Sequence, residues 1–358
     1  MQVIVIGAGI WGLACAYACA HRGDAVTVYD AGRVGDGASG GIVGALAPHV
    51  PDQWNPKKEF QFEALDTADV FWSKVDALSG IPSGYGRIGR LQPLLSQKAV
   101  ELAEARSTSA KDLWQGRYHW RIKPRPDTMS DTAAPYGVVH DTLAGRINPL
   151  QSTLSLACAC RTKGVKIHEN HPIHSLADNQ VSGSWGNANA DAIIVAAGVA
   201  GFNLIAPHTL LHPGSGIKGQ AALFDIALPH HPQIYADGVY IIPHVDGTVA
   251  VGSTSENKWN INGTDEKLDI LIAKAQAICP MLTTAPILKR WSGIRPKARR
   301  RDPMLGPVPN LQGFYAAMGA FKIGFGLSHK IGEVVAAQIH GEIVTIPESF
   351  TLDWHMAK

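Results

Sequence analysis

A glycine-rich turn between two apolar segments constrains the fold of this chain more than any other feature of its sequence. Residues 3–6 are a short β-branched run, which is typical of a strand buried on both faces. A turn with three glycines follows in residues 7–12, and residues 13–22 have the pattern of a helix that stops at Gly23. Residues 26–30 then alternate between apolar and polar side chains, so they predict a second strand.

The spacing of the three glycines predicts a site for the pyrophosphate of a dinucleotide. Gly7 permits the tight turn, Gly9 lets the backbone approach a pyrophosphate, and Gly12 lets the helix pack closely on the strand. The first turn of the helix offers unpaired N–H groups and the positive end of its dipole to phosphates. Asp30 lies 18 residues beyond Gly12, where a carboxylate accepts ribose hydroxyls and repels a 2′-phosphate. The segment therefore predicts a Rossmann-type unit that binds FAD or NAD rather than NADP.

Length, charge and cysteine content restrict what surrounds this unit. At 358 residues the chain is too long for one ordinary core, so two domains are expected. The 32 basic and 30 acidic side chains leave a net charge of +2, which argues against a nucleic-acid partner. The apolar run 3–20 has no basic segment before it and holds the spaced glycines, which argues against a targeting or membrane-spanning segment. Five cysteines without a ligand-like spacing indicate the reducing cytoplasm as the compartment.

Segments with the pattern of sheet elements recur along the whole chain. Residues 37–48 are rich in small side chains, so their backbone can lie against a flat ring system. A helix is predicted over 150–164, and strands are predicted at 165–168, 191–198 and 314–319. Because these pieces are far apart in sequence, we expect a doubly wound α/β sheet assembled from several segments, with a second domain inserted between them.

A set of motifs spread along nearly the full chain is more specific than any one of them. The set comprises residues 7–12, 39–48, 217–220, 239–243, 251–254, 291–296 and 319–326. Together these motifs resemble those of the D-amino-acid oxidase superfamily of flavoenzymes, and most of all those of the glycine oxidases. The resemblance implies FAD rather than NAD. It also implies a non-covalent flavin, because the C-terminal glycine segment lacks the cysteine that the sarcosine-oxidase branch carries there.

The resemblance further implies how the chain is divided. An FAD-binding domain of the Rossmann type is expected over 1–50, 145–215 and 300–358, with an inserted mixed-sheet (α+β) substrate domain over 51–144 and 216–299. The fingerprint and the matched segments together give the residues expected at the cofactor. These are Gly7, Gly9, Ile10, Trp11, Gly12, Asp30, Ala38, Ser39, Gly44, Val165, Ala197, Gly198, Gly319, Ile323, Gly324 and Phe325.

Two residues are expected to hold a substrate carboxylate. In this family the arginine of the matching Gly-x-Arg-Pro segment pairs with that carboxylate, which assigns the role to Arg295, and a planar guanidinium suits it. The alternative is a surface arginine beside the basic segment 297–301. Tyr240 matches a family tyrosine whose hydroxyl faces the substrate, and the alternative is a core tyrosine with its hydroxyl in water.

The remaining pocket residues are expected on three segments. Ala45 belongs to the small-residue stretch, and His49 follows it, where a structural role is favoured over catalysis. Ser255 matches a position that is apolar in glycine oxidases, so its hydroxyl implies a more polar pocket. No metal is expected at the histidines of residues 168–174, because their spacing is not that of a four-ligand site.

Lys322 departs from the family pattern. The usual Gly-His-x-Arg-x-Gly segment occurs here as residues 319–324, in which the histidine is absent and Lys322 stands in place of the arginine. A cation at this position would stabilise an anionic reduced flavin, which makes Lys322 a candidate catalytic residue. The alternative is a lysine that extends to solvent, and the sequence leaves both open.

The resemblance implies that a small amine or amino acid of the glycine, sarcosine or D-amino-acid type is oxidised to an imine. The expected step is hydride transfer from the substrate α-carbon to flavin N5, with oxygen as the acceptor and hydrogen peroxide as a product. One alternative is a dehydrogenase for an amino acid or a 2-hydroxy acid that passes electrons to a quinone or carrier protein. A catalytically inert flavin-binding protein is the other. The expected partner is a small molecule, and a homo-oligomer is left open.

Overall fold

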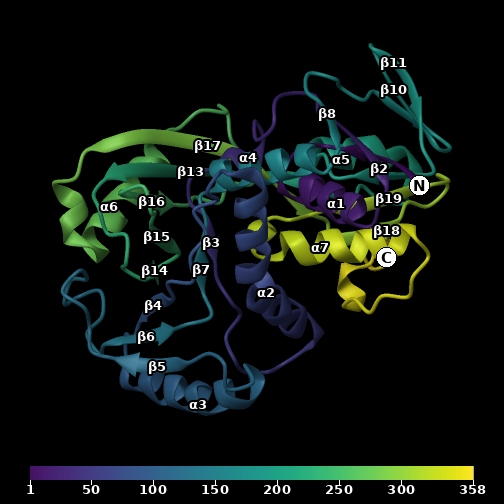
Figure 1. Ribbon diagram of the computed structural model, residues 1–358. Coiled ribbons are helices and arrows are strands. Elements are labelled where there is room, and N and C mark those ends of the chain that lie inside the picture. The colour runs from purple at the N-terminus through teal and green to yellow at the C-terminus, as the bar shows by residue number, and fades with distance from the viewer. Residues whose placement is uncertain (358) are drawn as a thin grey trace.

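The structure is a computed structural model that describes residues 1–357, and two large sheets dominate it. A six-stranded sheet lies on the right of Figure 1 and an eight-stranded sheet lies on the left. A three-stranded sheet and a two-stranded sheet accompany them. The predicted fold class, a Rossmann-type α/β sheet joined to a mixed-sheet unit, is confirmed.

The six-stranded sheet has the order β18-β19-β12-β1-β2-β8. Five of its strands are parallel, and β18 runs antiparallel to β19 at one edge. The strands are β1 Gln2–Ile6, β2 Ala25–Tyr29, β8 Lys166–His168, β12 Ala192–Val195, β18 Met304–Pro307 and β19 Phe314–Met318. The chain thus brings its first and last fifths together in one sheet, as the scattered strand patterns predicted.

Strand β1 is buried on both faces. Val3 and Val5 belong to one hydrophobic core, while Ile4 and Ile6 belong to another on the opposite face of the sheet. The first core includes residues of the long helices α1 (Ile10–His21), α2 (Pro56–Ser79), α4 (Pro149–Thr162) and α7 (Gly324–Ile339). The second includes Phe202 of the short helix α5 (Gly198–Ile205). Helices therefore cover both faces, which explains why the β1 sequence is apolar without alternation.

Side-chain caps fix where several helices begin. The Asn55 side chain accepts hydrogen bonds from the N–H groups at the start of α2, and Asn148 does the same for α4. Each helix then opens on a proline, which lacks the N–H that would be unpaired there. The α-helices are α1 Ile10–His21, α2 Pro56–Ser79, α3 Gln97–Leu113, α4 Pro149–Thr162, α5 Gly198–Ile205, α6 Glu266–Ile278, α7 Gly324–Ile339 and α8 Leu352–Met356.

The eight-stranded sheet has the order β17-β13-β16-β15-β14-β4-β6-β5 and is antiparallel except where β14 pairs with β4. Helix α6 packs on this sheet through a separate hydrophobic core. Its strands are β4 Arg90–Pro93, β5 Trp120–Lys123, β6 Val138–Asp141, β13 Gly214–Asp225, β14 Gln233–Ala236, β15 Val239–Pro243, β16 Thr248–Gly252 and β17 Ile287–Ala298. The long pair β13 and β17 forms the edge that carries Arg295.

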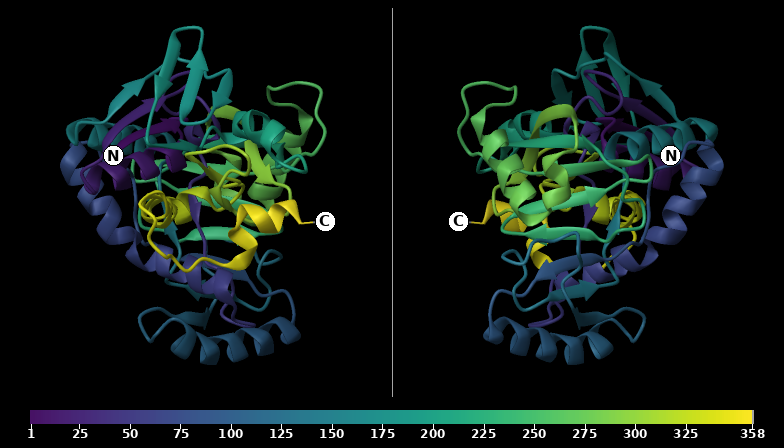
Figure 2. Two further views of the ribbon diagram at one scale, coloured as in Figure 1. Left: turned by 90° about the vertical axis from the view of Figure 1, so that its right-hand side faces the viewer. Right: turned by 90° about the vertical axis from the view of Figure 1, so that its left-hand side faces the viewer.

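The smaller elements extend the molecule at its two ends. Figure 2 shows the β10–β11 hairpin at the top and α3 at the bottom in both views. The small sheets comprise β9 Ser175–Ala177, β10 Gln180–Gly183 and β11 Gly186–Asn189, and the pair β3 Ala45–Leu46 and β7 Gly145–Arg146. The 3-10 helices are η1 Ala38–Gly40, η2 Ala206–His208, η3 Pro280–Thr283 and η4 Glu348–Phe350. No helix within residues 1–357 is long and apolar enough to cross a membrane.

Candidate active site

A cavity of about 660 Å³ lies at the carboxyl ends of the parallel strands. The residues that end or follow β1, β2, β12 and β19 line one part of it, and residues of β15 and β17 line another. The cavity therefore joins the two large sheets. In doubly wound folds, ligands bind at this edge of the sheet, so the position is that of a nucleotide site.

The fingerprint glycines are required by the local geometry. Gly7 has φ +110°, a conformation that side chains rarely adopt. A Cβ atom at Gly12 would lie 1.9 Å from the carbonyl oxygen of Gly7, so only glycine lets α1 approach β1 this closely. Helix α1 begins at Ile10, earlier than the predicted residue 13, because the chain is already helical right after the extended Gly9.

Asp30 locks the fingerprint turn to the end of β2. Its carboxylate accepts hydrogen bonds from the N–H groups of Ala8, at 2.6 Å, and Gly32, at 2.8 Å. Each carboxylate oxygen has a further lone pair, so the group keeps acceptors towards the cavity that it lines, as its predicted role at a ribose requires. Asp30 thus has a structural role that its sequence position did not predict.

Two further hydrogen bonds join distant segments around the start of α1. The Oγ of Ser39 accepts from the N–H of Ile10 at 3.0 Å, at the helix end where phosphates are expected. The indole Nε1 of Trp11 donates to the carbonyl oxygen of Gly324 at 2.8 Å. The small-residue stretch and the C-terminal glycine segment are thereby held against the fingerprint, so the cavity is built to surround an extended dinucleotide.

The predicted cofactor residues line this cavity, with two exceptions. Gly12 packs behind the turn, as its expected role requires. Val165 is buried in the core just before β8 and does not line the cavity, whereas His171 and Ile173, which follow β8, do. Ligands meet the carboxyl end of a parallel strand rather than its start, so the role of Val165 at the cofactor stays a prediction without support from its position.

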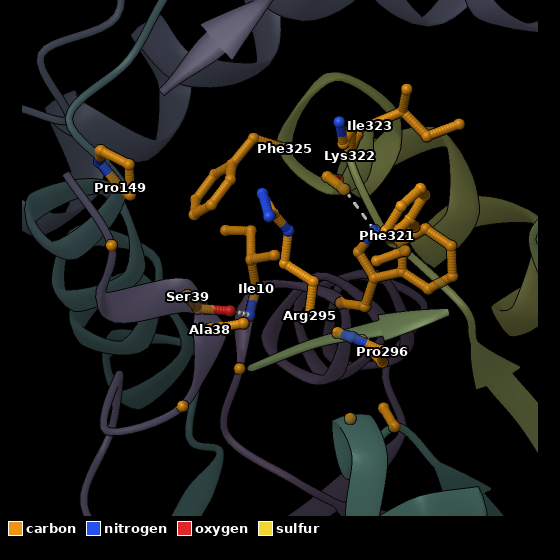
Figure 3. Close-up of a pocket in the computed structure, with 18 of the residues that line it drawn as sticks. Ile10, Ala38, Ser39, Pro149, Arg295, Pro296, Phe321, Lys322, Ile323 and Phe325 are labelled. Atoms are coloured by element: carbon orange, nitrogen blue, oxygen red, sulfur yellow. Dashed lines mark hydrogen bonds between the residues drawn. The ribbon is translucent and has the colours of Figure 1, made fainter. Parts of the chain in front are cut away.

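Arg295 enters the cavity from β17. Figure 3 shows its guanidinium in the middle of the drawn side chains, between Phe325 and Phe321 in that view. Nη1 donates to Ser253 Oγ at 2.8 Å, and Nη2 donates to the carbonyl oxygen of Thr254. Burial lowers the pKa of Arg295 to about 10, so the group is a cation at neutral pH. Arginine has five N–H donors, so these bonds orient the guanidinium and leave donors for a ligand.

Tyr240 lines the same cavity from β15, beside Tyr235 of β14. Their ring centroids are 4.4 Å apart. Burial raises the pKa of Tyr240, although the nearby Arg90 guanidinium acts to lower it. The hydroxyl therefore stays protonated at neutral pH and is a hydrogen-bond donor.

Lys322 also lines the cavity, together with Arg301 and Phe321. Burial lowers the pKa of Lys322, and the positive charges of Arg295 and Arg301 lower it further. Lys322 thus lies close enough to both arginines to be repelled by them. Arg301 belongs to the basic segment 297–301, for which the sequence predicted no role in the cavity.

Two of the three predicted pocket residues lie elsewhere. Ala45 lines the cavity, but the side chains of His49 and Ser255 are exposed and do not. Ser253 takes the position expected of Ser255, because β16 ends at Gly252 and the chain then turns away. The backbone N–H of His49 donates to Gln61 at 2.7 Å, which gives the residue a local structural contact.

The described part of the cavity lining contains no cysteine. The five free cysteines, of which four are buried in the cores, do not line the cavity. Within residues 1–357, no group of three or more histidine, cysteine or carboxylate side chains is arranged to hold a metal ion. His168 instead stacks on Tyr29, with ring centroids 5.1 Å apart.

A dinucleotide fingerprint that shares one cavity with an oriented guanidinium is the arrangement of a nucleotide-dependent oxidoreductase. A family model described as FAD dependent oxidoreductase matches residues 2–338. The chain belongs to this family, which includes D-amino-acid oxidase and whose members depend on FAD. The predicted family and cofactor are thereby confirmed.

Known proteins resemble the chain over nearly its whole length. It is 26% identical to a glycine oxidase of Pseudomonas aeruginosa over 341 residues, which cover 91% of each chain. The solved structure of glycine oxidase from Geobacillus kaustophilus covers 98% of both chains with a TM-score of 0.87 and 20% identity. That of an iminodiacetate oxidase from Chelativorans sp. BNC1 covers 98% of both with a TM-score of 0.85 and 22% identity. These structural matches establish a shared fold.

Proposed function

We propose that this FAD-dependent oxidoreductase oxidises a small amino acid to its imine. The observation that carries the proposal is the position of Arg295, a cation that is oriented by Ser253 and Thr254 within the cofactor cavity. A fixed guanidinium is suited to a planar carboxylate. The similarity to glycine oxidases supports an amino-acid substrate.

Arg295 and Tyr240 hold the substrate carboxylate in this proposal. The tyrosine hydroxyl is protonated, so it adds one donor to those of the guanidinium. Holding the carboxylate in this way fixes the α-carbon relative to the cofactor, which is the main task of the protein in flavin chemistry.

The substrate amine reacts in its neutral form. The cavity residues contributed by β15 and β17 include no histidine or carboxylate, so this part of the described lining offers no general base. Bound FAD supplies the acceptor for the hydride that leaves the α-carbon. The nitrogen lone pair forms the C=N bond and the imine nitrogen then loses a proton, after which water hydrolyses the imine to a keto acid and ammonia or an amine. Oxygen is proposed as the final acceptor, with hydrogen peroxide as its product.

Anaerobic mixing of the holoprotein with glycine, sarcosine, and D- and L-amino acids tests the proposal. At least one of them should bleach the flavin absorbance, and a peroxide assay under air then tests the acceptor. Bleaching without peroxide would favour a dehydrogenase that uses a quinone or carrier. If no amino acid bleaches the flavin, the proposed reaction is wrong, and 2-hydroxy acids become the next substrates to try before the protein is regarded as inert.

A further inference from the structure

Three cations lie close to one aromatic ring in the cavity. The charged groups of Arg295, Arg301 and Lys322 lie 6.0 Å, 5.8 Å and 5.7 Å from the centroid of Phe321. All four residues line the cavity. The protein thus concentrates positive charge in the part of the cavity where the substrate carboxylate is expected, beyond the one cation that a single carboxylate needs.

None of the three cations forms an ion pair with a carboxylate among the described residues. Asp302, which follows Arg301, pairs with Lys57 at 3.0 Å instead. Glu256 favours the charged form of Arg295 from a distance, but its own oxygens bond to Lys267, Gln220 and Thr254. Asp30 is the sole acidic residue in the described cavity lining, and it belongs to the nucleotide end.

The backbone holds this cluster in an unusual conformation. Arg301 has φ +73° and Phe321 has φ +39°, and neither is a glycine. Residues with side chains seldom adopt such conformations, and these persist where the surrounding structure fixes them. The N–H of Phe321 donates to the carbonyl oxygen of Pro296 at 3.0 Å, which ties the ring to the strand that carries Arg295. The fold therefore brings two non-adjacent basic segments to one ring.

We propose that Arg301 and Lys322 form a second anion subsite beside Arg295, so that the preferred substrate is a small amino acid with a second carboxylate. This inference rests on the proposed function and names its substrate class. Arg295 binds the carboxylate next to the reacting carbon, and Arg301 and Lys322 bind the other one. The second carboxylate belongs to an N-carboxyalkyl group or to an acidic side chain, since the subsite recognises the same chemistry in both.

Calorimetric titration of the holoprotein with succinate and butyrate tests the subsite without any reaction. Both ligands have four carbons and no amine, and they differ in the second carboxylate. Succinate should bind roughly tenfold or more tightly than butyrate, as expected for added charge-assisted hydrogen bonds. Arg301→Gln and Lys322→Gln should each reduce that ratio about tenfold, while Arg301→Lys should retain part of it.

Lys297→Gln is the matched control, because Lys297 lies on β17 near Arg295 but does not line the cavity. The ratio of succinate affinity to butyrate affinity in Lys297→Gln should equal that of the wild type. Equal affinity for succinate and butyrate in the wild type would overturn the subsite. Affinity ratios in Arg301→Gln and Lys322→Gln that match the wild-type ratio would also overturn it. A shift in flavin potential without a change in ratio would place the two cations at the cofactor and would also overturn it.

Anaerobic flavin reduction locates the second carboxylate. Iminodiacetate should reduce the flavin faster than sarcosine if this carboxylate is on the nitrogen substituent, and D-aspartate should be faster than D-alanine if it is on the side chain. A preference in neither pair would overturn the substrate class. Failure of all four to reduce the flavin, with the succinate preference intact, would instead refute the proposed amine oxidation and leave the anion subsite in place.

Discussion

The guanidinium of Arg295 lies in the space that a side chain on Gly219 would occupy. The two residues are on the paired strands β17 and β13, and a Cβ atom at position 219 would lie 2.1 Å from Nη2 of Arg295. The atom that would be displaced is the end of a flexible side chain. The orientation of Arg295 therefore depends on a glycine on the neighbouring strand.

Gly219→Ala should displace the guanidinium and reduce kcat/KM for amino acids by about 100-fold, because a displacement of about 1 Å at a reacting centre has effects of this order. Flavin content should change little. Gly263→Ala is the control, since a Cβ atom there meets nothing within 4 Å. Wild-type kinetics in Gly219→Ala would show that Arg295 does not orient the substrate.

Arg295→Ala should chiefly impair substrates that carry a carboxylate. Loss of a charge-assisted pair in a desolvated pocket costs about 2–5 kcal/mol, or roughly 30- to several-thousand-fold in kcat/KM. Arg295→Lys keeps the charge but loses the planar fork, so its loss should be intermediate. Steady-state kinetics on glycine and on ethylamine provide the comparison. An equal loss on ethylamine would indicate a folding defect instead.

Asp30→Lys should abolish or strongly weaken FAD binding, because it removes the ribose acceptor and the two backbone contacts that fix the turn. Asp30→Asn keeps one carbonyl oxygen and should retain part of the flavin. The measurement is the ratio of flavin to protein absorbance after purification, followed by release of the flavin in acid. Full flavin occupancy in Asp30→Lys would contradict the assigned position of the ribose.

Lys322→Met tests whether this cation acts on the cofactor. If the charge lies near the flavin, its loss should lower the reduction potential by tens of millivolts, on the order expected for a partly screened charge a few ångströms away. Lys322→Arg should largely preserve the potential. A redox titration with a reference dye gives the values. An unaltered potential in Lys322→Met would show that the charge does not stabilise the reduced flavin.

His329 makes the stability of the helix layer sensitive to acid. It is buried on α7, where its Nε2 lies 2.9 Å from Thr67 Oγ1 and its ring stacks on Phe71 of α2. Burial and the neighbouring Lys330 lower its pKa to about 4 from 6.5. The unfolded chain therefore binds more protons below pH 6.5, so stability falls as the pH drops from 6.5 towards 4.

The loss attributable to His329 should be about 2 kcal/mol between pH 7 and pH 5. Urea unfolding at the two pH values measures it. His329→Gln, which cannot be protonated, should show a shallower pH dependence even if it is less stable overall. An identical dependence in the variant would assign the acid sensitivity to other groups.

The nucleotide-binding half was predictable because its signals are local. Residues 3–30 combine a buried strand, three spaced glycines and an acidic strand end, and each of these has a short-range physical cause. Ala197 and Gly319 line the cavity, since each follows a strand of the same sheet. Val165 does not line it, because its apolar character indicated the strand but not which end of that strand faces the cavity.

The substrate half was less predictable because it depends on how loops turn. The sequence contains four basic residues between 297 and 301, and no local pattern distinguishes the one that turns inward. Arg301 differs from the other three in its left-handed backbone conformation. Ser253 and Ser255 both follow β16, and only Ser253 lines the cavity. The sequence does not show how many residues past the strand the chain turns away. The predicted domain boundaries and the catalytic roles of Arg295, Tyr240 and Lys322 stay predictions.

The hydrogen bond from Trp11 to Gly324 has a consequence for how the holoenzyme is made. The two residues are 313 positions apart, and the cavity is lined by segments from both ends of the chain. A ribosome therefore releases the fingerprint long before it releases the residues that close the site around FAD. A growing chain forms only one wall of the cavity. The sheet that contains β1 still lacks β19, which is translated near the end of the chain. The complete cofactor site is accordingly available only after almost the entire chain has been translated.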